Sequence, residues 1–346
     1  MKIKLKMKER LHYMDVAKGI LIFLVIIHHL PQLESEQGIT NGFLTALNGF
    51  SYYYSAFFMP AFFIITGYCT NFIKQPFTKF LLRQAKTIML PAFCLGAVSI
   101  WISLAGKACV IPLEYCKIGF KTFVISGGAF WFLTALFISK LLYRMGFSSF
   151  MKMMDMDIMR DVLLGVFCVV LYMIGCLLHQ CGVKNVWWFE HALTLTIFLY
   201  IGQMLRQYSL NMKLLYSGFL YIAIIVCMQL IGIRRPSITA VLNANVYDLP
   251  ILLLLGVTGS MLILYVSKLV NKNAILEYLG RNSLVIYCLH ISILGAVHNI
   301  GERFVGTEAV STVWFSVLQL CLTVMLLLLF SWLLNKRYLR VLQGKF

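Results

Sequence analysis

Four ionisable side chains fall inside one apolar segment near the start of the chain, MDVAKGILIFLVIIHHL: Asp15, Lys18, His28 and His29. Ionisable groups in a membrane segment cost several kcal/mol, so they are candidates for function. Histidine exchanges protons near neutral pH, and lysine and aspartate can hold charge in a polar network. The segment therefore offers the groups needed for proton transfer next to a fixed positive charge.

In a helix, three of these four residues share one face and the fourth, His28, lies on another. At about 100° per residue, the steps from Lys18 to His29 end within about 20° of the starting direction, about 16 Å along the axis. Asp15 comes three residues before Lys18, close enough to pair with it, whereas His28 points about 80° away from Lys18. Geometry alone leaves two interpretations open. Lys18 and His29 form a functional face, or they are surface residues near opposite sides of the membrane.

Further polar candidates lie in later apolar segments. Tyr287 and His290 are three residues apart and share a helix face, and Trp131 begins another apolar run. His290 could alternatively form a hydrogen bond that joins two helices, as polar residues in membrane bundles do. Glu190, next to His191, lies near the end of its apolar segment, where a solvated carboxylate is the alternative.

The loop QPFTKFLLRQAKTIMLP has apolar residues at helical spacing and carries Arg83 and Lys86 three positions apart. It predicts an amphipathic helix on the inner membrane surface that ends at Pro91. Its two cations anchor the loop on the cytoplasmic side or bind the phosphates of a cytoplasmic ligand.

These candidates require a membrane bundle to position them. The chain has 346 residues, 60% hydrophobic and 12% charged, which excludes an ordinary soluble domain and a disordered chain. We expect an all-α, polytopic integral membrane protein with a single domain over residues 1–346. About twenty apolar residues cross a bilayer. This rule predicts ten spans, near 15–33, 50–73, 88–106, 128–145, 161–180, 187–205, 213–231, 248–268, 282–299 and 311–334.

Charge counting orients the bundle. With the N-terminus inside, the inner loops and tails hold 22 Lys and Arg, and the outer loops hold seven. Positively charged loops stay in the cytoplasm, so both termini are predicted to be cytoplasmic. The net charge of +17 has the same explanation, because no nucleic-acid-binding pattern accompanies it.

The cysteines and the missing motifs exclude other chemistry. The ten cysteines show no zinc-ligand spacing, so no metal is expected, and Cys109 and Cys116 share a predicted outer loop where they could form a disulfide. The sequence has no GxxxxGK[ST] phosphate loop, no GxGxxG after a strand and no HExxH. ATP hydrolysis and metalloprotease chemistry are therefore disfavoured.

Five segments in order resemble the acyltransferase family 3 membrane proteins, which include carbohydrate O-acetyltransferases. The first is LHYMDVAKGILIFLVIIHH, where Lys18 and His29 match the family's basic-x10-His pattern and His28 does not. The lysine in this segment is typical of the branch that resembles fucose 4-O-acetylases. The others are AFFMPAFFIITGY, KFLLRQAKTIMLP, FWFLTALF and LGRNSLVIYCLH, at residues 56–68, 79–91, 130–137 and 279–290.

The resemblance implies transfer of an acyl group, usually acetyl, from cytoplasmic acyl-CoA to a sugar hydroxyl of a carbohydrate or lipid-linked glycan. It implies that His29 is the general base, with Lys18 and Asp15 in a supporting polar network. Transfer through an acyl-histidine is a variant that stays open. Arg83 and Lys86 would contact the phosphates of the donor, although many members have a second Arg where this chain has Lys86.

The resemblance also places the remaining candidates and the protein. We expect the acceptor cavity to be lined by Trp131, Glu190, Tyr287 and His290, and the protein to lie in a bacterial inner membrane. Two other functions stay open: a proton-coupled transporter or flippase of a glycan or lipid intermediate, and a membrane sensor. The acceptor, the acyl group and the oligomeric state are not specified by the sequence.

Overall fold

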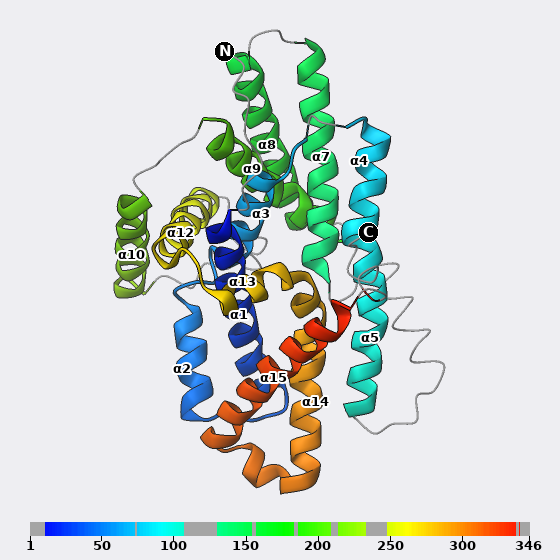
Figure 1. Cartoon of the computed structure of the whole chain (residues 1–346). Helices are drawn as coiled ribbons and strands as arrows, with labels where there is room; N and C mark the ends of the chain where they lie inside the picture. The colour runs from blue at the N-terminus through cyan, green and yellow to red at the C-terminus, as the bar shows by residue number, and fades with distance from the viewer. Residues whose placement is uncertain are drawn as a thin grey trace.

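The computed structural model describes residues 11–72, 75–106, 130–153, 157–182, 186–208, 214–232, 248–336 and 339. Within these ranges every regular element is helical, as predicted (Figure 1). Cys109 and Cys116 lie outside the described residues. The helices are α1 (His12–Glu36), α2 (Gly42–Ser51), α3 (Phe58–Cys69), α4 (Phe77–Gln84), the π-helix η1 (Ala85–Met89), α5 (Leu90–Gly106), α7 (Trp131–Met153), α8 (Asp157–Gln180), α9 (Phe189–Gln207), α10 (Leu214–Leu230), α12 (Asp248–Val270), α13 (Ala274–Arg281), α14 (Ser283–Val310) and α15 (Val313–Leu334).

Six helical stretches among the described residues are long and apolar enough to cross a membrane. They are α1, the continuous stretch Phe77–Gly106, and the greater part or all of α8, α12, α14 and α15. Two shorter apolar helices, α3 and the segment Gly218–Leu230 of α10, accompany them. The protein is therefore a multi-pass membrane protein, and the number of ten spans and the orientation of the termini stay predictions.

The second span begins later than predicted. Instead of one helix over 50–73, α2 ends at Ser51, turns cover 52–57, and α3 begins at Phe58. Pro60 lies in the first turn of α3, where proline is tolerated because the amide hydrogen that it lacks has no helical partner. The twelve residues of α3 rise only about 18 Å, less than the hydrocarbon thickness of about 30 Å.

The predicted end of a surface helix at Pro91 is wrong. The helix that starts at Phe77 continues through Pro91 to Gly106. Inside a regular α-helix, a proline ring collides with the carbonyl group four residues earlier. Here the wider π-turn Ala85–Met89 immediately precedes the proline, and such bulges accommodate an interruption without ending a helix.

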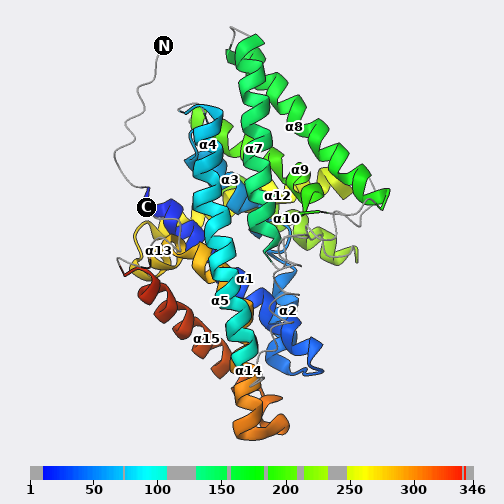
Figure 2. The same cartoon turned by 90° about the vertical axis from the view of Figure 1, so that its right-hand side faces the viewer.

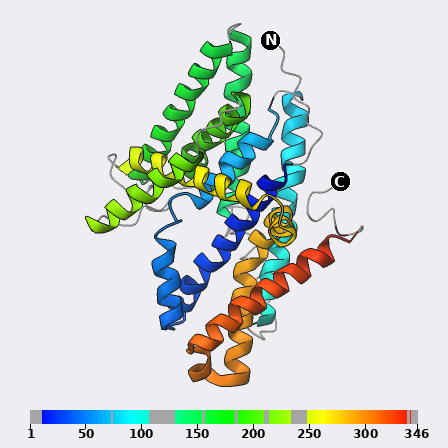
Figure 3. The same cartoon turned by 60° about the vertical axis from the view of Figure 1, so that its left-hand side comes forward.

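Helix α1 runs through the middle of the molecule, as the dark-blue ribbon in Figure 3 shows. It packs against α2, α3, α12, α13 and α14. At one end of the elongated molecule α14 packs on α5 and α15, and at the other α9 joins α3, α7 and α8 (Figure 2). Residues of α1 can therefore meet partners from both parts of the bundle.

At its N-terminal end, α1 touches α13 backbone to backbone. A β-carbon on Gly280 would overlap the carbonyl oxygen of Asp15, and one on Gly19 would overlap the carbonyl oxygen of Leu276. Small residues permit such close approach between membrane helices. Both glycines belong to the segments that resemble the acyltransferase family, so their role here is to bring those two segments together.

Farther along, α1 is held by a buried polar cluster. Glu34 is fully buried, and its carboxylate accepts hydrogen bonds from His298 Nδ1 of α14 at 3.0 Å and Gln319 Nε2 of α15 at 2.8 Å. His298 and Gln319 are buried as well. Buried polar groups stay stable when they are paired in this way. The cluster therefore fixes α1 against α14 and α15, five residues beyond His29.

We expect Gly280→Ala to lower the free energy of unfolding by about 1–3 kcal/mol, because the new methyl group overpacks the α1–α13 contact. Thermal unfolding of the detergent-solubilised protein measures this change. Gly49→Ala in α2 is the control, because its β-carbon would meet nothing within 4 Å. Equal midpoints for the two variants would contradict the close packing.

We expect Glu34→Ala to destabilise the protein by about 1–3 kcal/mol, because it leaves the buried His298 Nδ1 without its acceptor and removes the shorter of the two hydrogen bonds of Gln319 Nε2. Glu36→Ala, at an exposed position two residues later, should have little effect. The same unfolding measurement compares them. A Glu34 variant as stable as the Glu36 variant would show that the cluster does not hold α1.

Candidate active site

The structure brings His29 of α1 against His290 of α14. Their ring centroids are 5.1 Å apart, and the ring of Tyr287 is 5.8 Å from that of His290. His29 is partly exposed, whereas His290 is buried. Three of the predicted site residues thus form one group. The ring of His28 also lies 5.4 Å from that of His29, but its other ring contacts are Tyr54 and Phe58 rather than His290 or Tyr287.

The protonation of His290 follows from its hydrogen bond. Its Nδ1 lies 2.7 Å from the carbonyl oxygen of Tyr287, and a carbonyl can only accept, so Nδ1 carries the proton. In the neutral ring, Nε2 then holds a lone pair. This buried Nε2 has no hydrogen-bond partner in the described part of the chain. His290 therefore presents an unused acceptor beside His29.

A cavity of about 160 Å³ extends from Lys18 to Tyr287, the member of this group that lines it. Lys18 and Ile22 of α1 line it, Thr66 lines it from α3, Leu136 from α7, and Tyr287 from α14. Tyr287 also contacts the His290 ring. The face that carries Lys18 and His29 was expected from helical spacing, and the structure places a cavity next to that face.

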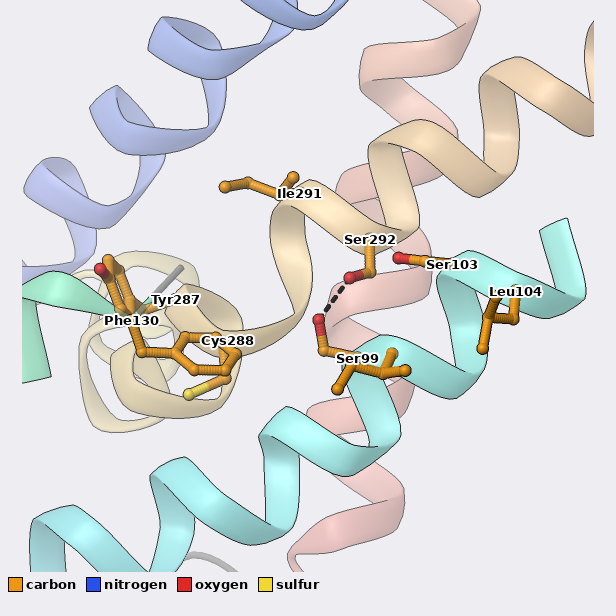
Figure 4. Close-up of a pocket in the computed structure, with 9 residues that line it drawn as sticks. Ser99, Ser103, Leu104, Phe130, Tyr287, Cys288, Ile291 and Ser292 are labelled. Carbon is orange, nitrogen blue, oxygen red and sulfur yellow. Dashed lines mark hydrogen bonds between the residues drawn. The ribbon is translucent and has the colours of Figure 1, made fainter. Parts of the chain in front are cut away.

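A second cavity, of about 330 Å³, lies between α5 and α14 on another side of Tyr287 (Figure 4). Tyr287, Phe130 and Cys288 lie together at one end of the view. At the other end, Ser99 and Ser292 hydrogen-bond to each other across the two helices, near Ser103. Tyr287 lines both cavities, so its side chain lies between them.

An aromatic group adjoins this wall. Trp131 packs on Trp188 and His191, with ring centroids 6.2 and 5.3 Å away. Phe132, next to Trp131, packs on Tyr287 at 5.3 Å, and its amide donates to the Tyr287 hydroxyl at 3.3 Å. This chain of contacts links Trp131 with the histidine pair.

Two backbone features distinguish the loop that carries the tryptophans. Trp187 and Trp188 have φ values of 55° and 56°, which non-glycine residues rarely adopt. The Nε1 of Trp188 and the Nδ1 of His191 are buried without a hydrogen-bond partner among the residues described. Backbone strain of this kind occurs where the surrounding structure holds a functional geometry.

Glu190 is less available than the sequence suggested. It is buried rather than solvated, and one carboxylate oxygen lies 3.0 Å from His179 Nδ1 of α8. Its neighbour His191 contacts Trp131 instead. The predicted acceptor residue Glu190 therefore lies behind the aromatic group, in an ion pair between two helices.

Asp15 pairs across helices rather than with Lys18. Its Oδ2 lies 3.8 Å from Arg281 Nε of α13, and Arg281 also pairs with Glu277. Hydrogen bonding from His12 and Arg281 lowers the pKa of the Glu277 carboxyl below its usual value. These contacts fix the start of α1 next to α13 and leave Lys18 facing the cavity.

Arg83 and Lys86 are exposed on α4 and η1, away from the histidine pair. Lys140 falls inside the predicted span 128–145, although it was counted among the cations of the cytoplasmic side, and it is buried in α7. The signal was present, because Lys140 interrupts the apolar run FISKLLY. Glu34 and His298 were missed because they lie 264 residues apart. His179 was missed because its partner Glu190 is on the next helix.

The comparisons with known proteins agree with this arrangement. Residues 11–336 match the acyltransferase 3 family, described as "Acyltransferase domain", so the chain belongs to that family and is an acyltransferase. Nodulation protein NolL of Mesorhizobium japonicum (strain LMG 29417 / CECT 9101 / MAFF 303099) is 36% identical over 135 residues, which are 38% of this chain. The match covers 34% of that relative's length. No solved structure matches the chain.

Two further points concern metal binding and the branch of the family. Among the described ranges, no group of three or more His, Cys, Asp and Glu side chains is placed to hold a metal ion. The comparisons establish the family without identifying a branch, so the resemblance to fucose 4-O-acetylases stays a prediction.

Proposed function

We propose that this acyltransferase moves an acetyl group from acetyl-CoA to a sugar hydroxyl of a carbohydrate or lipid-linked glycan. It would act in a bacterial cell membrane with its basic end, which carries Lys18 and Arg83, toward the cytoplasm. The observation that carries the proposal is the pairing of His29 with His290 next to a cavity that contains Lys18. A base and a cationic entrance are what transfer from a phosphorylated thioester requires.

In the proposed reaction, His29 removes the proton of the sugar hydroxyl while its oxygen attacks the thioester carbonyl. The new C–O bond forms, the C–S bond breaks, and the proton on His29 passes to the departing thiolate to give free CoA. His290 assists by position. Its Nε2 lone pair can accept the N–H of His29, which leaves the other His29 nitrogen free as the base.

The two substrates are assigned to the two cavities. The donor's acyl-bearing arm would occupy the cavity that begins at Lys18 and ends at Tyr287. The acceptor would approach through the cavity that contains Ser99 and Ser103, whose hydroxyls can hydrogen-bond a sugar. The Trp131 group adjoins the same wall and offers aromatic faces for the apolar side of a sugar ring.

The test of the base uses inside-out membrane vesicles, labelled acetyl-CoA and a glycan fraction from the same cells. We expect His29→Ala to reduce label transfer at least a hundredfold, which is typical of the loss of a general base. His28→Ala is the neighbouring control: its ring touches that of His29 at 5.4 Å but packs on Tyr54 and Phe58 rather than on His290, so this variant should retain most of the transfer.

Transfer by both variants would keep the enzyme and remove His29 from its chemistry. Failure of well-expressed wild-type protein to label any glycan would contradict the proposed donor or acceptor. In that case, glycan movement across the vesicle membrane without CoA consumption would favour a transporter.

The acceptor assignment predicts a different effect for Trp131→Ala. We expect the KM for the glycan fraction to rise about tenfold, equivalent to about 1.4 kcal/mol, with the KM for acetyl-CoA unchanged. Trp101→Ala, at a 60% exposed position on α5, should change neither value. A rise in the donor KM alone would place Trp131 on the donor side.

A further inference from the structure

A lysine in the middle of α7 is buried without an opposite charge. Lys140 is 8% exposed, and apolar residues precede and follow it in FISKLLY. Among the residues described, no carboxylate forms an ion pair with it. A buried charge without a partner costs several kcal/mol. Lys140 can therefore stay charged at low cost only beside an anion that comes from outside the chain.

The charged neighbours of Lys140 are themselves cations. Helix α4 and the π-helix η1 pack on α7, and Lys18 of α1 lines the same cavity as residues of α7. Arg83 of α4 and Lys18 are therefore close enough for their positive charges to act on Lys140. Asp15, the acidic residue one turn before Lys18, is paired with Arg281 of α13. Three helices thus direct positive charge at one region in which no ion pair neutralises it. Repulsion between these groups makes the region favourable for a negatively charged ligand.

Helical spacing connects this region to the donor cavity. Leu133 and Leu136 line the cavity from α7, and Lys140 is the next residue of that helical stripe. On α3 Phe62 and Thr66 line the cavity, and the stripe continues to Cys69.

Cys69 marks the place where the two stripes meet. Its side chain is exposed, and the charges of Lys18, Arg206 and Lys140 act on it. The single negative charge of Asp15 acts on it as well. The cavity stripes of α1, α3 and α7 therefore all lead toward this group of cations.

We infer that Lys140, together with Lys18 and Arg83, forms an anion-binding cradle that holds phosphate groups of the acyl donor. The identity of the donor rests on the proposed function. Lysine ammonium groups bind phosphate as point charges, and Arg83 adds a fork of N–H donors. Phosphates held here leave the donor's uncharged arm to extend along the cavity toward Tyr287 and the histidine pair. Lys140 is thus a binding and positioning residue that takes no part in proton transfer.

Ligand binding to the purified full-length protein tests this inference. We expect Lys140→Met to weaken CoA binding at least tenfold and to leave the binding of acetylpantetheine, which lacks phosphate, unchanged. Lys140→Arg should restore most of the CoA affinity. Lys79→Met, at an exposed position on α4, is the control and should bind CoA as the wild type does.

Equal CoA affinity in wild type and Lys140→Met would overturn the inference. An equal loss for CoA and acetylpantetheine would also overturn it, because it would indicate a structural role.

Cys69 provides a second test in the wild-type chain. CoA should slow the modification of Cys69 by N-ethylmaleimide, measured on its peptide by mass spectrometry, and acetylpantetheine should protect it less. Lys140→Met should also lower, several-fold, the preference of Cys69 for an anionic over a neutral thiol reagent. Modification of Cys69 at the same rate with and without CoA would overturn the placement of the cradle.

The cradle and the proposed function can fail separately. CoA binding that depends on Lys140, in a protein that transfers no label to glycan, supports the cradle and contradicts the proposed function. Transfer that depends on His29, in a protein whose CoA affinity ignores Lys140, overturns the cradle alone.

Discussion

The close contact between α1 and α13 is the constraint on which the site depends. Gly19 and Gly280 remove the side chains that would separate the two helices, so the backbone of each lies against the other. This contact sets the height and rotation of α1 at one end, and the Glu34 cluster sets them at the other. Lys18 and His29 lie between the two fixed points. A helix held at both ends keeps the two side chains in register with partners that come from other helices.

Much of the helical framework was predictable because apolar length and charge distribution act locally. The apolar stretches coincide with helices in the described ranges, since backbone groups in a hydrocarbon layer have to bond within their own segment. The errors came from prolines. Pro91 by itself predicts the end of a helix, but the π-turn Ala85–Met89 before it makes room for the proline ring and the helix continues. The helix that contains Pro60 begins at Phe58, eight residues after the predicted start of the span at residue 50. The aromatic residues around Tyr52 are apolar and therefore extended the predicted span, but they form turns rather than helix.

The candidate site was only partly predictable. The common face of Lys18 and His29 follows from helix geometry, and Tyr287 and His290 follow from their spacing in a later apolar segment. The structure brings His290 against His29 and Tyr287 against the cavity of Lys18. Pairing was not visible, because each pair depends on how two different helices pack against each other. Asp15 therefore has Arg281 as its partner rather than the lysine one turn away. Glu190 similarly has His179.

The ring of Tyr287 has a consequence for the membrane itself. A protein that admits one substrate on each side of a bilayer risks becoming a pore through which ions leak. Here the two cavities share a single aromatic wall, backed by Phe132 and braced by the Phe132 amide. Under the proposed function, the donor would reach this wall from one face and the acceptor from the other while the ion gradient across the membrane is maintained. Electrical insulation and catalysis would then depend on the same side chain, which limits how far evolution can enlarge either cavity.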